Sequence, residues 1–219
     1  MRLVLLGPPG AGKGTQCKRI VEKYNLAHLS SGDILRAERA EKTELGQKAQ
    51  SYMDSGKLVP DDVIIGMMIK AIEKIEGGYV LDGFPRTVRQ AEELDKALED
   101  VGKSIDAVVD LQVPDEVIDA RMTGRRSCPE CGAVYHIENL KPKVDNICDN
   151  DGTELVQRSD DTSEVVAKRL KIYHEQTAAV VGYYEGVGKK IIEIDANQDV
   201  DAVKDSVISE LDKLSGQAG

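Results

Sequence analysis

The sequence predicts an α/β fold built on a five-stranded parallel sheet. Short apolar segments alternate about five times with segments of helical periodicity, and this order is typical of a parallel sheet with connecting helices. The run Leu3–Leu6 in the first of them is uniformly apolar rather than alternating, as expected of a strand that is buried on both faces. A glycine-rich loop joins the first strand to the first helix.

The elements follow from these patterns. The expected strands are residues 2–6, 27–30, 79–82, 107–113 and 190–194. The expected helices are residues 15–24, 87–98, 114–121, 162–180 and 200–214, with further helical segments between 33 and 71. Within residues 33–71, Pro60 followed by two aspartates marks the start of a helix. Residues 127–157 interrupt the alternation and are expected to form a loop-rich insert.

Composition limits the possible functions. The 219 residues are 41% apolar and carry 29 basic against 39 acidic side chains, a net charge of −10. Such a chain has no net attraction to nucleic acids or anionic lipids. Its apolar runs fall far short of the roughly 18 residues of a membrane span, its N-terminus does not resemble a signal peptide, and four cysteines are too few for a disulfide scaffold. We expect a soluble, cytoplasmic protein that binds neither nucleic acid nor membrane.

The loop after the first strand has the spacing of a phosphate-binding loop. Gly7 to Thr15 read GPPGAGKGT, in which four residues separate Gly7 from the pair Gly12-Lys13. Glycines let backbone N–H groups turn toward a phosphate, and Lys13 supplies a positive charge for the β- and γ-phosphates. An ordinary glycine-rich turn is the alternative, which the strand and helix on either side disfavour. The expected architecture is a P-loop three-layer fold.

One position departs from the usual phosphate loop. Gly14 stands where a Ser or Thr normally ligates magnesium, and Thr15 comes one residue later. We therefore expect Mg²⁺ to be held through water molecules and a carboxylate, either Asp82 or Asp110.

Arginines recur within short motifs along the chain. Guanidinium groups suit phosphate oxygens because they donate two parallel hydrogen bonds and stay charged. The arginines of this kind are Arg36, Arg86, Arg121, Arg125, Arg126, Arg158 and Arg169. Arg19, Arg39 and Arg89 are instead expected to be solvated surface residues.

Four segments together resemble the adenylate kinase family: Gly7–Thr15, residues 81–87, residues 124–126, and Arg158 with residues 168–170. The resemblance extends from Met1 to about Leu214, and the long insert is similar to the bacterial-type, long-lid form with a zinc-binding lid. It implies a monomer that reversibly transfers the terminal phosphoryl group of MgATP to AMP, giving two ADP. Another nucleoside monophosphate kinase, with UMP or CMP as acceptor, is the alternative.

The resemblance also implies roles for particular residues. The ATP site would comprise Gly10, Ala11, Gly12, Lys13, Gly14, Thr15, Arg121, Arg125, Val134, Tyr135 and Gln198. The AMP site would comprise Ser31, Arg36, Lys57, Leu58, Val59, Gly83, Phe84, Pro85, Arg86, Gln90, Arg158 and Arg169. The catalytic residues would be Lys13, Arg86, Arg125, Arg158 and Arg169.

The same resemblance divides the chain into three parts. The core domain would comprise residues 1–29, 60–125 and 161–219. A helical AMP-binding (NMP) domain would comprise residues 30–59, and a lid with a metal site residues 126–160.

The chemistry needs no general base. A phosphate oxygen is the nucleophile, and it is mostly ionised at pH 7. The reaction requires alignment, charge neutralisation and exclusion of water. His28, His136 and His174 are accordingly expected to be structural or solvated. Asp160 and Asp161 are expected to be exposed or to cap the next helix, with the orientation of an arginine as the alternative.

Three cysteines and an aspartate have the spacing of a zinc site. Cys128 and Cys131 form one pair, and Cys148 and Asp151 follow after sixteen residues. Two such pairs supply four tetrahedral ligands, so the zinc would be structural. A Cys128–Cys131 disulfide, a metal-free loop, and Asp149 as fourth ligand remain alternatives. Cys17, in the first helix, is expected to be a buried apolar residue.

A function of another class is a zinc-ribbon nucleic-acid-binding module on a P-loop ATPase. The net charge of −10 disfavours it, as does the shortage of stacking side chains, with one Phe and no Trp.

Overall fold

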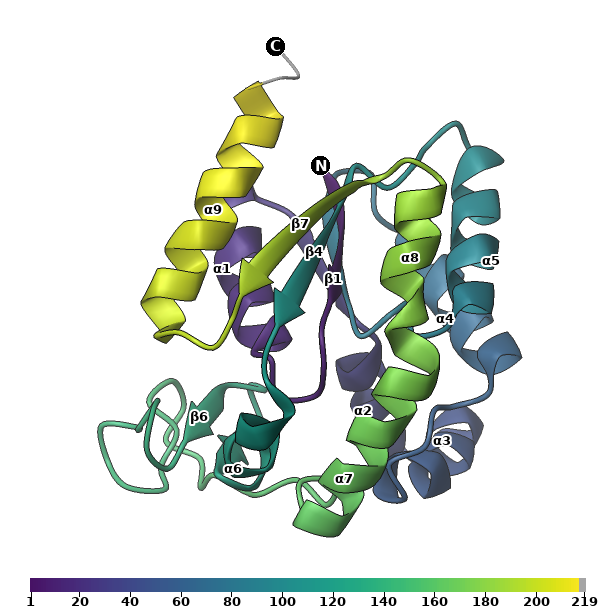
Figure 1. The fold of residues 1–219 in the computed structure, drawn as a ribbon. Helices are drawn as coiled ribbons and strands as arrows, with labels where there is room; N and C mark the ends of the chain where they lie inside the picture. Colours follow the sequence, from purple (N-terminus) through teal and green to yellow (C-terminus); the bar gives the residue numbers. More distant parts are fainter. Residues whose placement is uncertain (217–219) are drawn as a thin grey trace.

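The computed structural model describes residues 1–216 and has five parallel strands in its main sheet (Figure 1). The strand order is β2-β3-β1-β4-β7. The bounds are β1 Arg2–Leu6, β2 Ala27–Ser30, β3 Tyr79–Asp82, β4 Ala107–Gln112 and β7 Lys190–Asp195. All five strands predicted from the sequence are present, with ends shifted by at most one residue.

Helices cover both faces of this sheet, which makes three layers. On one face lie α1 (Lys13–Tyr24) and α9 (Val200–Gly216); on the other lie α4 (Asp61–Glu73), α5 (Val88–Glu99) and α8 (Ala179–Gly186) (Figure 1). Leu3 and Leu5 of β1 pack with α1 and α9, whereas Val4 and Leu6 pack with the other helices. Burial on both faces explains why the run Leu3–Leu6 of β1 is uniformly apolar.

Between β2 and α4 the chain forms two short helices, α2 (Ser31–Ala40) and α3 (Glu44–Asp54). The side chain of Ser30 accepts a hydrogen bond from the Asp33 amide at the start of α2, and that of Thr43 does the same for the Gly46 amide in α3. At Gly46, a Cβ would lie 2.3 Å from the Glu38 carbonyl carbon. Glycine therefore allows α3 to pack closely against α2.

The second insert follows a 3₁₀ turn (Asp115–Val117) and α6 (Ile118–Thr123). It contains an antiparallel pair, β5 (Arg125–Ser127) and β6 (Val134–His136). Its small core comprises Cys128, Ala133, Tyr135, Cys148 and Leu155. The sequence predicted only loops here, because strands of three residues are too short to show a periodicity.

The predicted helix over residues 162–180 is interrupted and longer than expected. It consists of α7 (Ser163–Ile172), a π-helical turn (Tyr173–Thr177) and α8, which ends six residues later than predicted. The Ala178 amide donates to the Tyr173 carbonyl, five residues back, at 2.9 Å. A π turn adds one residue to a helical turn, and a single such turn is too short to be recognised in the sequence pattern.

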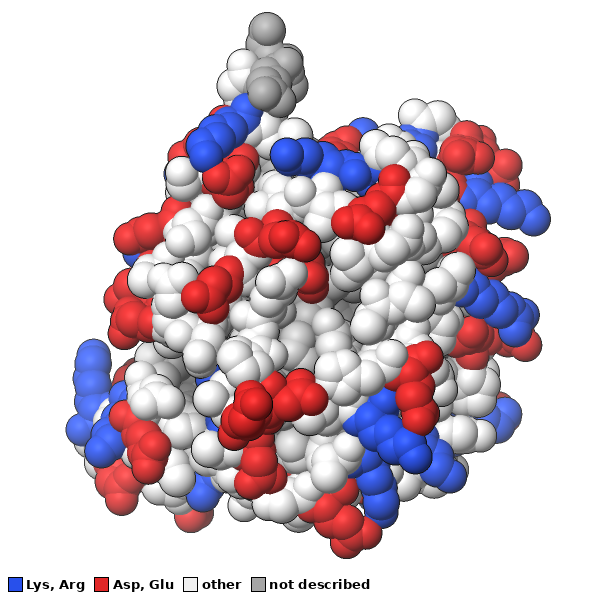
Figure 2. Space-filling view, in the orientation of Figure 1, with Lys and Arg blue, Asp and Glu red and all other residues white. Residues whose placement is uncertain are grey.

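Within the described residues, no helix combines the length and the apolar character of a membrane span. On the face drawn in Figure 2, acidic side chains are scattered over the surface and basic ones occur in small groups.

Candidate active site

A single cavity of about 690 Å³ brings the predicted site residues together. It is lined by the loop after β1, both inserts, α7 and the loop after β7. Every residue assigned above to ATP or AMP lines this cavity except Phe84. Phe84 is fully buried in the core on the α4 and α5 face. It therefore anchors the segment whose neighbours Gly83, Pro85 and Arg86 reach the cavity.

The glycine-rich loop adopts a conformation that side chains would disturb. A Cβ on Gly7 would lie 2.5 Å from the Leu111 carbonyl oxygen. Gly12 precedes α1 with φ of 86°, in the left-handed region that favours glycine. α1 begins at Lys13, two residues before the predicted Thr15. Its free N–H groups therefore lie at the cavity, where the helix terminus favours an anion.

Lys13 is held against this loop. Its Nζ donates to the carbonyl oxygens of Gly7 and Pro8 at 2.7 and 2.8 Å. Burial lowers the Lys13 pKa to about 8; the Asp82 carboxylate opposes this, and the Arg86 guanidinium adds to it. The amine thus lies where positive charge is crowded and an anionic ligand would be stabilised.

All the motif arginines except Arg126 line the cavity, and they come from different elements. Arg86 Nε donates to the Gly83 carbonyl oxygen at 2.7 Å, and Arg158 Nε donates to Ser127 Oγ at 2.9 Å. Burial, together with the neighbouring Arg169 guanidinium, lowers the pKa of Arg86 to about 10. Burial likewise lowers the pKa of Arg158 to about 10. Such mutual destabilisation of cations is expected in a site built for a polyanion.

Two aspartates orient two of these arginines. Asp161 is fully buried, and its Oδ2 accepts from Arg125 Nε at 2.8 Å. Its Oδ1 lies 3.5 Å from a terminal nitrogen of Arg169, which donates to Asp160 Oδ2 at 2.6 Å. The prediction that these acids are exposed or cap a helix was wrong, and the alternative, orientation of an arginine, is what the structure shows.

On the AMP side, side chains hold the backbone around Gly83. Ser31 Oγ donates to the Gly83 carbonyl oxygen at 2.6 Å. Gln90 is almost fully buried; its Oε1 accepts from the Arg86 amide at 2.7 Å, and its Nε2 donates to Asp61 Oδ1 at 2.7 Å. Arg36 pairs with Asp33, which the sequence analysis did not single out.

On the ATP side, Arg121 bridges α6 to the loop after β7, because its guanidinium donates to the Ala196 carbonyl oxygen at 3.0 Å. Gln198 lies in the same loop, and its Nε2 donates to Asp195 Oδ2 at 3.1 Å. Tyr135 is mostly buried, and its hydroxyl accepts from the Asp149 amide at 2.8 Å. The Tyr135 hydroxyl therefore points into the insert rather than into the cavity.

The two carboxylates considered for magnesium differ in position. Asp82 lines the cavity, whereas Asp110 is only 6% exposed and does not. A Cβ on Gly14 would lie 3.4 Å from Asp82 Oδ2, so glycine keeps the space beside this carboxylate open. Of the two, Asp82 fits a hydrated Mg²⁺ beside the phosphate loop.

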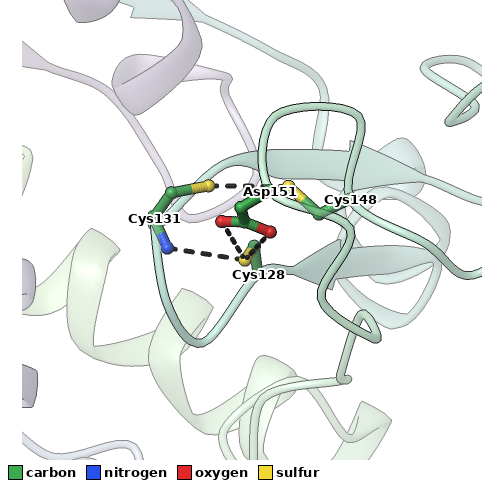
Figure 3. Close-up of side chains that lie close together, drawn as sticks. All are labelled: Cys128, Cys131, Cys148 and Asp151. Atoms are coloured by element: carbon green, nitrogen blue, oxygen red, sulfur yellow. Dashed lines mark hydrogen bonds between the residues drawn. The ribbon is translucent and has the colours of Figure 1, made fainter.

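The three cysteines and Asp151 converge in the second insert (Figure 3). Their ligand atoms all lie within 4.8 Å of one another. Cys131 Sγ and Cys148 Sγ are 3.5 Å apart, and Cys128 Sγ lies 3.3 Å from Asp151 Oδ2. Zinc ligands in a tetrahedron are separated by roughly 3.3–3.8 Å, so these side chains fit a zinc ion. Asp149 Oδ1 instead accepts from the Lys143 amide at 2.8 Å.

The histidines take different positions. His136 Nδ1 accepts from the Glu138 and Asn139 amides at 3.1 and 3.2 Å, and His174 pairs with Asp115 at the surface. His28 Nε2 lies 3.5 Å from Asp82 Oδ2 at the cavity.

Known proteins are similar to this chain over nearly its whole length. The family model of adenylate kinase matches residues 5–189. An adenylate kinase of Lachnospira eligens is 49% identical over 210 residues, and the alignment covers 95% of this chain and 98% of the Lachnospira protein. One of Archaeoglobus fulgidus is 47% identical over 216 residues, covering 98% of this chain and 99% of its own. The chain therefore belongs to the adenylate kinase family.

Proposed function

We propose that the cavity binds MgATP and AMP together and aligns them for direct phosphoryl transfer. The overall reaction is that of the family: ATP and AMP are converted reversibly to two ADP. The observation that carries the proposal is the convergence of Lys13 and six of the seven motif arginines, all but Arg126, on one cavity of about 690 Å³. A volume of this size is in the usual range for a site that encloses small ligands.

The two nucleotides would occupy opposite ends of the cavity. We assign the ATP phosphates to residues 10–15 and the rest of ATP to Arg121, Arg125, Val134, Tyr135 and Gln198. We assign AMP to Ser31, Arg36, Lys57, Leu58, Val59, Gly83, Pro85, Arg86, Gln90, Arg158 and Arg169. The buried Phe84 supports the AMP side through packing.

In this mechanism the protein positions groups and neutralises charge. An ionised AMP phosphate oxygen attacks the γ-phosphorus in line, the bond from that phosphorus to the β–γ bridging oxygen breaks, and the remaining ADP leaves with the bond's electrons. No side chain has to remove a proton from the nucleophile. The oxygens of the transferring group would be stabilised by Lys13, Arg86, Arg125, Arg158 and Arg169. Mg²⁺, the ion that adenylate kinases use with ATP, neutralises the β- and γ-oxygens when bound, and Asp82 would hold it through water.

Contacts that join the two inserts to each other and the second insert to the core support a closing motion. Ser159 Oγ donates to Asp54 Oδ1 at 2.8 Å, and Lys18 Nζ donates to the Gly132 carbonyl oxygen at 3.1 Å. We assign the NMP domain to residues 30–59 and the lid to residues 126–160. Both would close over a core of residues 1–29, 60–125 and 161–219, of which residues 217–219 lie outside the described part of the chain. Closure of this kind excludes water and prevents hydrolysis of ATP.

We further propose that the chain acts as a monomer in the cytoplasm. All the nucleotide-binding residues assigned here come from one chain. The thiols of Cys128, Cys131 and Cys148 are free, and a reducing compartment keeps thiols available for zinc.

The choice of acceptor is tested by a coupled assay with MgATP and AMP, CMP, UMP or GMP. We expect ADP to form rapidly with AMP and at least about 100-fold more slowly with the pyrimidine nucleotides. If the rate with CMP or UMP were comparable to the rate with AMP, the assignment of AMP as the acceptor would be wrong. No transfer to any of the four would contradict the proposed function.

Cys148→Ser is expected to lose the bound metal and to lower Tm by roughly 5–10 °C, because the lid core in which Cys148 lies is small. Elemental analysis and thermal unfolding measure the two effects. Asp149→Asn is the matched control and is expected to retain zinc, whereas Asp151→Asn is expected to lose it. Full zinc content in Cys148→Ser would refute the ligand assignment.

A further inference from the structure

A second cluster of metal-binding side chains lies beside the phosphate loop, away from the lid cysteines. It comprises Cys17, His28 and Asp82, whose ligand atoms all lie within 4.8 Å of one another. The His28 Nε2 to Asp82 Oδ2 distance is 3.5 Å. The proposed mechanism uses only Asp82 among these three residues.

The fold brings these side chains to one face of the sheet. β2 and β3 are parallel neighbours, with His28 opposite Val80 and Ser30 opposite Asp82. Side chains two residues apart on a strand point to the same face, so His28 and Asp82 share the face that Val80 occupies. Val80 packs in the same cluster as Cys17 of α1. The thiol therefore meets the imidazole and the carboxylate between the helix and the sheet.

The polar atoms of this cluster are incompletely satisfied. His28 Nε2 is buried and has no hydrogen-bond partner among the described residues. Cys17 is fully buried, with its Sγ near the Asp82 carboxylate. A buried imidazole nitrogen that lacks a hydrogen bond costs free energy. A divalent cation would bind this nitrogen, and the charges of a thiolate and a carboxylate would balance it.

We propose that Cys17, His28 and Asp82 form a second site for a divalent cation of the zinc class. Zinc–ligand distances of about 2.0–2.3 Å imply ligand separations of roughly 3.3–3.8 Å. The 3.5 Å between His28 and Asp82 already fits, and the other separations contract by at most about 1 Å. Sulfur and imidazole donors select zinc, cobalt or cadmium, whereas magnesium prefers oxygen ligands only.

The open coordination position of this ion faces the nucleotide cavity. His28 and Asp82 line the cavity, whereas Cys17 lies behind them. A bound ion would occupy Asp82, the carboxylate assigned above to hydrated magnesium. Excess zinc is therefore expected to inhibit turnover, and this consequence, unlike the site itself, rests on the proposed function.

Zinc stoichiometry tests the site directly. The full chain, with its lid zinc in place, is dialysed without nucleotide against increasing free Zn²⁺. We expect the wild type to bind a second equivalent. The variants Cys17→Ala and His28→Gln alter different elements. Each should lower the affinity for the second zinc equivalent at least tenfold and leave the affinity for the first unchanged. His174→Gln is the control, because it removes an exposed histidine that also pairs with an aspartate.

The proposal is overturned if the wild type binds a single equivalent, or if both cluster variants keep the second equivalent at wild-type affinity. Loss of the second equivalent in His174→Gln alone would also overturn it. Turnover at increasing free zinc is measured separately: the two cluster variants should tolerate at least tenfold more zinc than the wild type. A second equivalent that does not inhibit would support the site and contradict the role of Asp82 in magnesium binding.

Discussion

Lys13→Met is expected to lower kcat by about 10³-fold. The Lys13 amine lies in the phosphate loop and lines the cavity with the arginines. Removing one preorganised charge from the transferring oxygens typically costs 10²–10³-fold, and phosphoryl transfer depends almost entirely on such charges. Steady-state turnover with saturating MgATP and AMP measures the effect.

The same substitution is expected to stabilise the nucleotide-free chain below pH 8. The folded-state pKa of Lys13 is about 8, below its ordinary value of 10.5, because of burial. The charged amine therefore destabilises the folded state below pH 8, and this cost disappears as the pH rises from 8 to 10.5. Thermal unfolding at pH 7 should show an unchanged or higher Tm for Lys13→Met, so that lost activity is not lost folding.

Lys23→Met is the matched control on the same helix. Lys23 lies at the surface, where its Nζ pairs with Asp212 at 2.7 Å, and exposed pairs contribute little. Its turnover should stay within about twofold of the wild type. A near-normal kcat in Lys13→Met would remove Lys13 from the proposed mechanism.

Most of the fold follows from local patterns in the sequence. Strands buried on both faces produce unbroken apolar runs such as residues 3–6, so their positions are predictable to within one residue. The glycine spacing of the phosphate loop is equally local. By contrast, β5 and β6 are too short to show a pattern, and so is the single π turn at Tyr173–Thr177.

The composition of the site was predictable from the family motifs, but the contacts that orient it were not. Arg125 and Asp161 are 36 residues apart, and only the folded chain shows that they pair. Phe84 lies inside a nucleotide-binding motif yet is buried in the core. The cluster of Cys17, His28 and Asp82 likewise combines three elements, and no spacing in the sequence reveals it.

Asp161→Asn is expected to destabilise the chain by about 3 kcal/mol and to lower kcat by about 10–100-fold. The carboxylate is fully buried against Arg125 and Arg169. Asparagine keeps the shape but removes the charge, and breaking a buried ion pair typically costs 3–5 kcal/mol. Both arginines would lose a fixed orientation, and misplacement of about 1 Å is costly for phosphoryl transfer. Denaturant unfolding and steady-state kinetics measure the two effects.

The surface pair of Arg89 and Asp62 provides the control for this substitution. Their side chains are 61% and 79% exposed, and solvent screens such a pair. Asp62→Asn should therefore change stability by less than about 1 kcal/mol and leave kcat unchanged. If Asp161→Asn lowered stability but kept normal kcat and KM, Asp161 would only stabilise the fold. A joint loss, with saturating nucleotide restoring stability but not kcat, would identify it as a positioning residue for Arg125 and Arg169.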